Sequence, residues 1–365
     1  MVSGASPSAA ARPRLSLKLL ACAVSVIASL AIAEGAATLL HHGAYPYLNL
    51  FEADARYGVR LQANASTRVR SRDGRITDIS TNSLGFRGPQ WLETPTEGPR
   101  VMLLGDSQVF GYGVPFEETM GPKLERRLGP LAHAFCAAVP SWGPHESSLA
   151  LAELGPRFRP TQVVFVANAA NDWFETVPNL RRTSAEDGWA ASPGPRGTAF
   201  PFRSFLFGRS HLVLAARQVA KVIGQAELPP AELALRLGRD LDRLRTGHAP
   251  WRSPLGASLA ETVELCRKLS CEVVAVALPL DVQVSRTEWP KYRSEGAEMA
   301  ASEALLEDFI ADANSLGVPA ANLLPGLRAA EPGAFLPDDY HLSGRGHSVV
   351  AALIASLIQQ PRVSR

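Results

Sequence analysis

The stretch Val101-Met-Leu-Leu-Gly105-Asp106-Ser107 decides how we interpret the chain. An uninterrupted apolar run leads into a glycine, an aspartate and a serine. A short continuous apolar run is typical of a strand that is buried on both faces of a parallel sheet. Ser107 therefore follows directly on such a strand. Open α/β sheets bind their ligands at that carboxyl edge, so the serine is a candidate functional residue.

Alternating strands and helices are expected on the C-terminal side of this stretch. Further strands are predicted over residues 134–139, 162–166, 273–278 and 320–324, and helices over residues 117–128, 146–154, 259–269, 299–316 and 344–358. Gly155 with Pro156 predicts one helix end, Gly317 predicts another, and Ser343 is expected to cap the last helix. The alternation predicts an α/β fold, a three-layer sandwich around a central parallel sheet of about five strands.

The N-terminus indicates a membrane segment. A basic tail without acids, residues 1–18, precedes an apolar run over residues 19–40. That run can span a bilayer, which takes about 20 residues, if Glu34 lies near the far interface where its carboxylate reaches water. Basic residues before a span favour a cytoplasmic N-terminus. We expect a single-pass transmembrane helix in the inner (cytoplasmic) membrane, with the catalytic domain in the periplasm.

In two alternatives to this anchor, the N-terminal segment is cleaved off. Ala31-Ile-Ala33 is similar to the small-residue cut site of a secretory signal peptide. Leu19-Leu-Ala-Cys22 superficially resembles a lipoprotein cleavage site, although the apolar stretch before it is too short. We prefer the uncleaved anchor.

The chain is expected to divide into a basic cytoplasmic tail, the anchor or signal peptide, a linker with a hairpin, and the α/β domain, over residues 1–18, 19–40, 41–98 and 99–361. Asp73-Gly74 suits the turn of the hairpin. Residues 173–255 form an insertion between the third strand of the domain and its next helix. An insertion at this edge can be a cap over the substrate or an elaboration without substrate contact.

Composition excludes several classes of function. The net charge is only +2, so no basic face is implied and nucleic acid is not an expected partner. Four cysteines do not make a disulfide framework in a chain of 365 residues. We prefer free thiols to a Cys266–Cys271 disulfide, which export would allow. No His/Cys cluster has zinc spacing, so neither a metal nor another cofactor is expected.

A candidate acid–base pair lies near the end of the chain, in Asp338-Asp-Tyr-His341. In a short loop before the last helix, Asp338 can accept the Nδ1–H of His341 and leave Nε2 free to take a proton from Ser107. Asp339 is the alternative orienting carboxylate. We interpret three further histidines, His41, His42 and His347, as surface residues.

The order of these residues resembles the SGNH/GDSL hydrolase superfamily over roughly residues 100–360. Gly105-Asp106-Ser107 matches its first block, Asn171-Asp172 its third and Asp338-x-x-His341 its last, and Asn82-Ser-Leu-Gly-Phe-Arg-Gly88 looks like membrane-anchored bacterial members. The resemblance implies a flavodoxin-like fold and a Ser107–His341–Asp338 triad. The spacing of Asp339 fits the family pattern less well.

The resemblance also implies an oxyanion hole made by the Ser107 N–H, the Asn171 side chain and one N–H of the second block. In Val139-Pro-Ser141-Trp-Gly143 we place Ser141 at the second-block position, with Gly143 as the alternative if the turn needs positive φ. The third block departs from the family because Ala169 replaces a glycine. We expect Asp106 and Asp172 to hold turns, and Trp142 either lines the substrate site or packs beneath the loop.

The sequence therefore favours an exported serine hydrolase, a carboxylic-ester or O-acetyl esterase that works through an acyl-enzyme. Its substrate is expected to be a small-molecule, glycan or lipid ester. An O-acyltransferase on an envelope glycan would use the same triad and differ in acceptor and water exclusion. A non-catalytic envelope binding protein is the third alternative.

Overall fold

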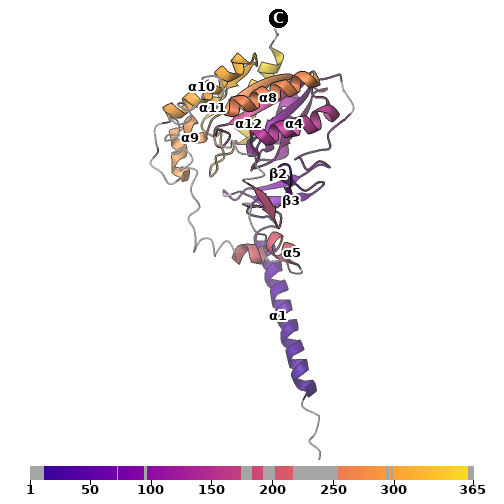
Figure 1. Ribbon diagram of the computed structural model, residues 1–365. Helices are drawn as coiled ribbons and strands as arrows, with labels where there is room; N and C mark the ends of the chain where they lie inside the picture. Colours follow the sequence, from indigo (N-terminus) through magenta and orange to yellow (C-terminus); the bar gives the residue numbers. More distant parts are fainter. Residues whose placement is uncertain are drawn as a thin grey trace, which may run out of the picture.

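The computed structural model describes residues 12–71, 73–93, 97–173, 183–191, 202–216, 254–292, 296 and 299–360. Figure 1 shows an α/β domain at one end of a long helix, α1 (Arg12–Leu40). Within α1, Leu17–Leu40 is long and apolar enough to cross a membrane. A signal sequence near the N-terminus would have the same length and composition.

A parallel five-stranded sheet forms the centre of the domain, which confirms the predicted α/β class. Its strands are β5 (Arg100–Gly105), β6 (His133–Ala138), β7 (Gln162–Asn168), β10 (Glu272–Leu278) and β11 (Ala320–Asn322), in the order β11-β10-β7-β5-β6. Every residue of β5 is buried, as its continuous apolar run predicts. The carboxyl ends of β5, β7 and β10 therefore meet at one edge.

The helices form two groups, one on each face of the sheet. Their bounds are α3 (Met120–Leu128), α4 (Pro144–Phe158), α8 (Pro254–Leu269), α10 (Ala300–Ser315), α11 (Leu324–Ala330) and α12 (Gly344–Gln359). α3, α11 and α12 pack together, and α4, α8 and α10 form the other group (Figure 1). Right-handed crossovers require this division, because the chain moves from β5 to β6 in one direction and then reverses.

The ends of two helices match the sequence prediction and one does not. Gly317 follows α10 with a φ of 71°, and Ser343 Oγ accepts the backbone N–H groups of Arg345 and Gly346 at the start of α12. α4 does not end at Gly155 but continues through Pro156 to Phe158. The proline falls in the last turn, and the buried Phe158 ring holds that turn on the core.

The segment between α1 and the α/β domain is folded. β1 (Phe51–Asp54) pairs with β2 (Gly58–Leu61), and β3 (Ser66–Arg70) with β4 (Ile76–Ser80). The second pair is the expected hairpin, with Gly74 at a φ of 81°, although residues 71–75 make its connection longer than a two-residue turn. Both pairs lie between α1 and the sheet (Figure 1).

Parts of the insertion pack against this segment. They include β8 (Ser184–Glu186), β9 (Trp189–Ala191), α5 (Arg203–Gly208) and a helical turn over residues 211–216. The Phe51 N–H donates to the Gly188 carbonyl, and Asn49 Nδ2 donates to the Gly208 carbonyl. Residues 174–182, 192–201 and 217–253 of the insertion lie outside the described residues. The alternatives of cap and elaboration thus stay untested.

Cys266 and Cys271 form a disulfide that joins the end of α8 to the start of β10. This finding corrects our preference for free thiols. The chain reverses tightly here, with Ser270 at a φ of 58°, and the Cys271 N–H donates to the Cys266 carbonyl. The two Cα atoms are consequently only 4.7 Å apart, which lies within the range that a disulfide bridges.

Candidate active site

Ser107 stands at the carboxyl end of β5 and begins the short helix α2 (Ser107–Phe110). Asp106 holds this strand-to-helix turn, as expected: Oδ1 accepts the Gln108 N–H and Oδ2 accepts Asn168 Nδ2 from the end of β7. Gly105 allows the close approach, because a Cβ there would lie 2.5 Å from Val109 Cγ2. The serine itself is partly exposed, so a ligand can reach its hydroxyl.

His341 lies beside this serine. Its Nε2 is 2.9 Å from Ser107 Oγ, a distance that suits proton transfer. The imidazole is nearly buried and lies close to two aromatic rings, with ring-centre distances of 5.1 Å to Tyr112 and 4.4 Å to Tyr340. These rings restrict its rotation, so Nε2 stays directed at the hydroxyl.

The carboxylate on the other side of the imidazole is that of Asp339, with Oδ1 2.8 Å from His341 Nδ1. This geometry corrects our assignment of Asp338, which is exposed. The reason is a tight turn in which the Leu336 N–H donates to the His341 carbonyl and the Asp339 N–H donates to the Leu336 carbonyl. The turn directs Asp339 toward the histidine, and the same Oδ1 accepts the His341 N–H at 3.3 Å.

Gln108 is a site residue that our sequence reasoning missed. Its Nε2 donates to the Tyr340 carbonyl and its Oε1 accepts the Leu342 N–H, both at 3.1 Å. The side chain next to Ser107 thereby holds the backbone on each side of His341. Gln108 is itself buried. No sequence signal pointed to this contact, because its partners lie more than 230 residues further along the chain.

Our sequence reasoning also missed a group of three residues that contacts the backbone of Asp339. Lys291 Nζ donates to the Asp339 carbonyl at 3.1 Å and lies 3.3 Å from Asp281 Oδ2. Tyr292 Oη also donates to that carboxylate. Asp281 follows β10 and is fully buried, and this burial raises its pKa to about 6, against the opposing effects of Tyr292 and Lys291. The network ties the histidine loop to the edge of the sheet.

The second-block turn does contain a positive φ, the condition under which we preferred Gly143, but Ser141 and not Gly143 adopts it, so the choice of oxyanion donor stays a prediction. Ser141 adopts a φ of 80°, where glycine is usual, whereas Gly143 has a φ of −121°. The Gly143 N–H already donates to Glu146 Oε2 at the start of α4. Trp142 packs beneath the loop: it is buried, stacks on Tyr57 with ring centres 4.8 Å apart, and donates to the Val59 carbonyl.

The third block forms a turn after β7. The Asn171 and Asp172 N–H groups donate to the Asn168 carbonyl, and Asp172 Oδ2 accepts the Asn168 N–H, so Asp172 holds the turn as expected. Ala169 pairs with Leu278 of β10 through its N–H. Asn171 thus lies at the same sheet edge as Ser107. Its role toward an oxyanion stays a prediction.

The three histidines that we interpreted as surface residues differ in burial. His347 is buried inside α12, which corrects that interpretation. Burial lowers its pKa to about 3. His42 is exposed, whereas His41 is partly buried, with its ring centre 6.1 Å from that of His211. Neither lies at the sheet edge that carries Ser107.

No protein-family model and no curated protein matches the chain. Among solved structures, a GDSL-like lipase from Bacteroides thetaiotaomicron is 14% identical, with 73% of this chain and 91% of that chain covered and a TM-score of 0.38. A carbohydrate acetylesterase family member from Sinorhizobium meliloti is 13% identical, with 72% and 97% covered and a TM-score of 0.37. The structural neighbours are thus GDSL-like lipases and esterases at low identity.

Proposed function

We propose that this chain is a membrane-anchored serine ester hydrolase with its catalytic domain outside the cytoplasm. The observation that carries the proposal is the line of three groups Ser107, His341 and Asp339, joined at 2.9 and 2.8 Å. A hydroxyl, an imidazole and a carboxylate in this order are a nucleophile, a base and an orienting acid. The substrate class is an ester of a small molecule, a glycan or a lipid.

In the first half of the reaction, Ser107 Oγ attacks the ester carbonyl carbon while its proton passes to His341 Nε2. Asp339 stays ionised, accepts the Nδ1–H and stabilises the imidazolium. The tetrahedral intermediate then expels the alcohol, which takes the proton from Nε2, and leaves an acyl group on Ser107. In the second half, water gives a proton to Nε2 and attacks the acyl carbon. The second tetrahedral intermediate then releases the carboxylic acid while Ser107 Oγ takes the proton from Nε2, which restores the serine hydroxyl and the neutral imidazole.

The oxyanion needs donors at the same edge. The Ser107 N–H begins α2, the Ser141 N–H follows β6, and the Asn171 side chain follows β7, so all three belong to loops at the carboxyl ends of neighbouring strands. Hydrogen bonds to the negatively charged oxygen stabilise the intermediate more than the substrate. Loss of one such donor costs about 10²–10³ in rate.

We propose further that α1 remains attached, with its N-terminus in the cytoplasm. The helix runs without a break through Ala31 and Ala33, the flanks of the alternative cut site. Its outer part is also tied to the domain, because Glu34 accepts hydrogen bonds from Ser210, His211 and Leu212. The intact mass of protein purified from membranes tests this: retention of residues 1–33 supports the anchor, and their absence contradicts it.

Turnover of a small ester tests the hydrolase proposal directly. The full chain in detergent micelles is incubated with p-nitrophenyl acetate, and free acetate is measured beside p-nitrophenol. We expect Ser107→Ala to abolish turnover, whereas the matched variant Ser83→Ala, at an exposed serine after β4, keeps it. Equal turnover in Ser107→Ala and the unmodified chain would contradict the proposal.

A further inference from the structure

The motif Asn82-Ser-Leu-Gly-Phe-Arg-Gly88 forms a tight turn after β4. The Asn82 N–H donates to the Phe86 carbonyl at 2.8 Å, and Asn82 Oδ1 accepts the Phe86 N–H at 3.0 Å. Gly88 adopts a φ of 106°, and a Cβ there would lie 2.4 Å from the Phe116 ring. The turn is therefore closed on itself and packs directly on the chain that follows α2.

Arg87 is the charged residue of this turn, and it is only 3% exposed. Its Nη1 donates to the carbonyls of Phe110, at 3.1 Å, and of Gly111, and its Nη2 donates to the Val114 carbonyl at 2.6 Å. Burial lowers the pKa of Arg87 to about 10, so the guanidinium stays charged at neutral pH. Hydrogen bonds from a charged donor are stronger than neutral ones. One side chain thus holds three carbonyls of residues 110–114.

The loop that Arg87 holds is in contact with both Ser107 and His341. Gly111 and Gly113 adopt φ values of 75° and 82°, and glycine leaves such conformations easily because it has no Cβ. The Ser107 carbonyl accepts the N–H groups of Gly111 and Tyr112 at 3.0 and 3.1 Å. The Tyr112 ring centre lies 5.1 Å from that of His341. A displacement of this loop would therefore move Ser107 and the ring beside His341 together.

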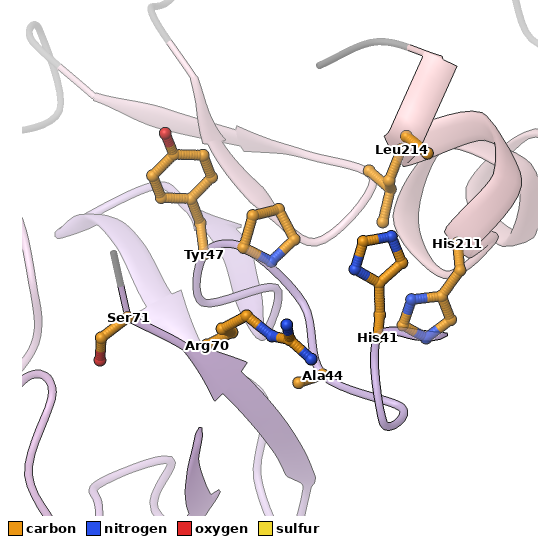
Figure 2. Close-up of a pocket in the computed structure, with 9 residues that line it drawn as sticks. His41, Ala44, Tyr47, Arg70, Ser71, His211 and Leu214 are labelled. Carbon is orange, nitrogen blue, oxygen red and sulfur yellow. The ribbon is translucent and has the colours of Figure 1, made fainter. Parts of the chain in front are cut away.

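The segment that carries Arg87 also contacts the chain that leaves α1. The Arg70 N–H at the end of β3 donates to the Tyr45 carbonyl at 2.8 Å. Figure 2 shows the Arg70 side chain extending toward Ala44 beside a cavity of about 260 Å³. Directly after β4, Thr81 pairs with Arg87, so the motif and the hairpin are joined. This segment, which the sequence predicts as a linker, thus contacts the chain after α1 on one side and the loop after α2 on the other.

We infer that Arg87 is a positioning residue for Ser107 and His341, because it fixes residues 110–114 and through them the Ser107 carbonyl and the Tyr112 ring. It acts through the backbone and not on the substrate. A buried cation is costly to desolvate, and its hydrogen bonds to the loop after α2 offset that cost. The inference rests on the proposed function, since it concerns the same serine and histidine.

Steady-state kinetics of matched arginine variants test the inference. The full chain in detergent micelles hydrolyses p-nitrophenyl acetate at a temperature at which near-UV circular dichroism shows each variant to be folded. Arg87→Met and Arg87→Lys are compared with Arg100→Met. Arg100 is likewise buried, at 2% exposed, and donates to the Phe158 and Leu92 carbonyls. It begins β5 at the amino end, whereas Ser107 follows the carboxyl end.

Both methionine variants should melt at a lower temperature than the unmodified chain, because buried carbonyls lose their donors. We expect Arg87→Met to lower kcat about 10–100-fold with KM within about threefold, since a displacement of about 1 Å at the reacting groups can cost 10²-fold. Arg100→Met should keep kcat within about threefold. Arg87→Lys should fall between the two, because an ammonium group keeps the charge but not the planar fork that reaches three carbonyls.

A kcat of the Arg87 variants equal to that of Arg100→Met would overturn the inference and leave the proposed function intact. If Arg87→Met does not fold, the comparison of Arg87→Lys with Arg100→Met decides in the same way. Absence of turnover in the unmodified chain would instead contradict the proposed function, and the inference with it.

Discussion

Substitution of the two adjacent aspartates before His341 should have different effects on activity. Asp339 contacts His341 Nδ1, whereas Asp338, one residue earlier in the same turn, is exposed. We expect Asp339→Asn to lower kcat/KM for p-nitrophenyl acetate by about 10²–10⁴, the range of general acid–base catalysis. Asp338→Asn is the matched control and should stay within about threefold. A larger loss in Asp338→Asn than in Asp339→Asn would contradict the assignment.

Ser141 carries a backbone conformation that a non-glycine residue adopts only with strain. Ser141→Gly should relieve that strain and leave its N–H in place, so we expect the free energy of unfolding to rise by up to about 1 kcal/mol with activity retained. Ser141→Val, β-branched at the same φ, should lower both. Urea unfolding and ester turnover measure the two effects. Lower stability of the glycine variant than of the valine variant would refute the explanation.

At the level of single residues, the sequence paired Ser107 with His341, which lie 2.9 Å apart in the structure, but it preferred Asp338 to Asp339 as the carboxylate beside the imidazole. Ser107 and His341 belong to separate motifs with distinct residue types, which spacing reveals. Asp338 and Asp339 are chemically identical, and only the turn closed by Leu336 decides which one faces the imidazole. Burial of His347 escaped prediction for a similar reason, because α3 and Arg87 that surround it come from distant segments.

Helix α2 carries Ser107 and also contacts the loop that carries His341. Through Gln108 it holds the Tyr340 carbonyl and the Leu342 N–H, so one side chain next to Ser107 fixes the backbone on both sides of His341. We expect Gln108→Ala to lower kcat about 10–100-fold with KM nearly unchanged, and to cost about 1–3 kcal/mol of stability, because buried backbone groups lose their partner.

The matched control for this prediction is Gln359→Ala, at an exposed glutamine in the last turn of α12. Steady-state kinetics and urea unfolding separate positioning from stability. If Gln108→Ala loses stability but keeps kcat, Gln108 has a structural role only and does not position the base.

Most elements could be predicted from the pattern of apolar residues, because strands such as β5 and β10 are continuous apolar runs between turn residues. Departures occur where tertiary contacts override a local signal. α4 passes through Pro156 because Phe158 is buried against the sheet, and the Cys266–Cys271 bond depends on a reversal that no local pattern specifies. The contact of β1 with the insertion, in which the Phe51 N–H donates to the Gly188 carbonyl, likewise has no local sequence signal, because the two residues are far apart in the chain.

The stability of the whole molecule should fall in acid because of His347. Burial lowers the pKa of this histidine from 6.5 to about 3 in the folded protein. The unfolded chain therefore binds an extra proton between roughly pH 6.5 and 3, and the free energy of unfolding falls as the pH drops through that window. Each unit of pKa difference corresponds to about 1.4 kcal/mol.

Urea unfolding of the full chain at a series of pH values checks this effect. His347→Gln cannot gain the proton, so its stability should depend less steeply on pH between 6.5 and 3 than that of the unmodified chain. His42→Gln, at an exposed histidine, should keep the original slope. An unchanged slope in His347→Gln would contradict the burial argument.

The molecule as a whole joins a long apolar helix, a folded connecting segment and an α/β domain, and the function we propose depends on Ser107, His341 and Asp339 at the edge of the sheet. The most direct test is labelling of the folded full chain with a fluorophosphonate, followed by intact mass and peptide mapping. We predict a single adduct on Ser107, formed far more slowly in Asp339→Asn than in Asp338→Asn. Absence of an adduct in folded protein, or an adduct on another residue, would contradict the assignment of Ser107 as an activated nucleophile.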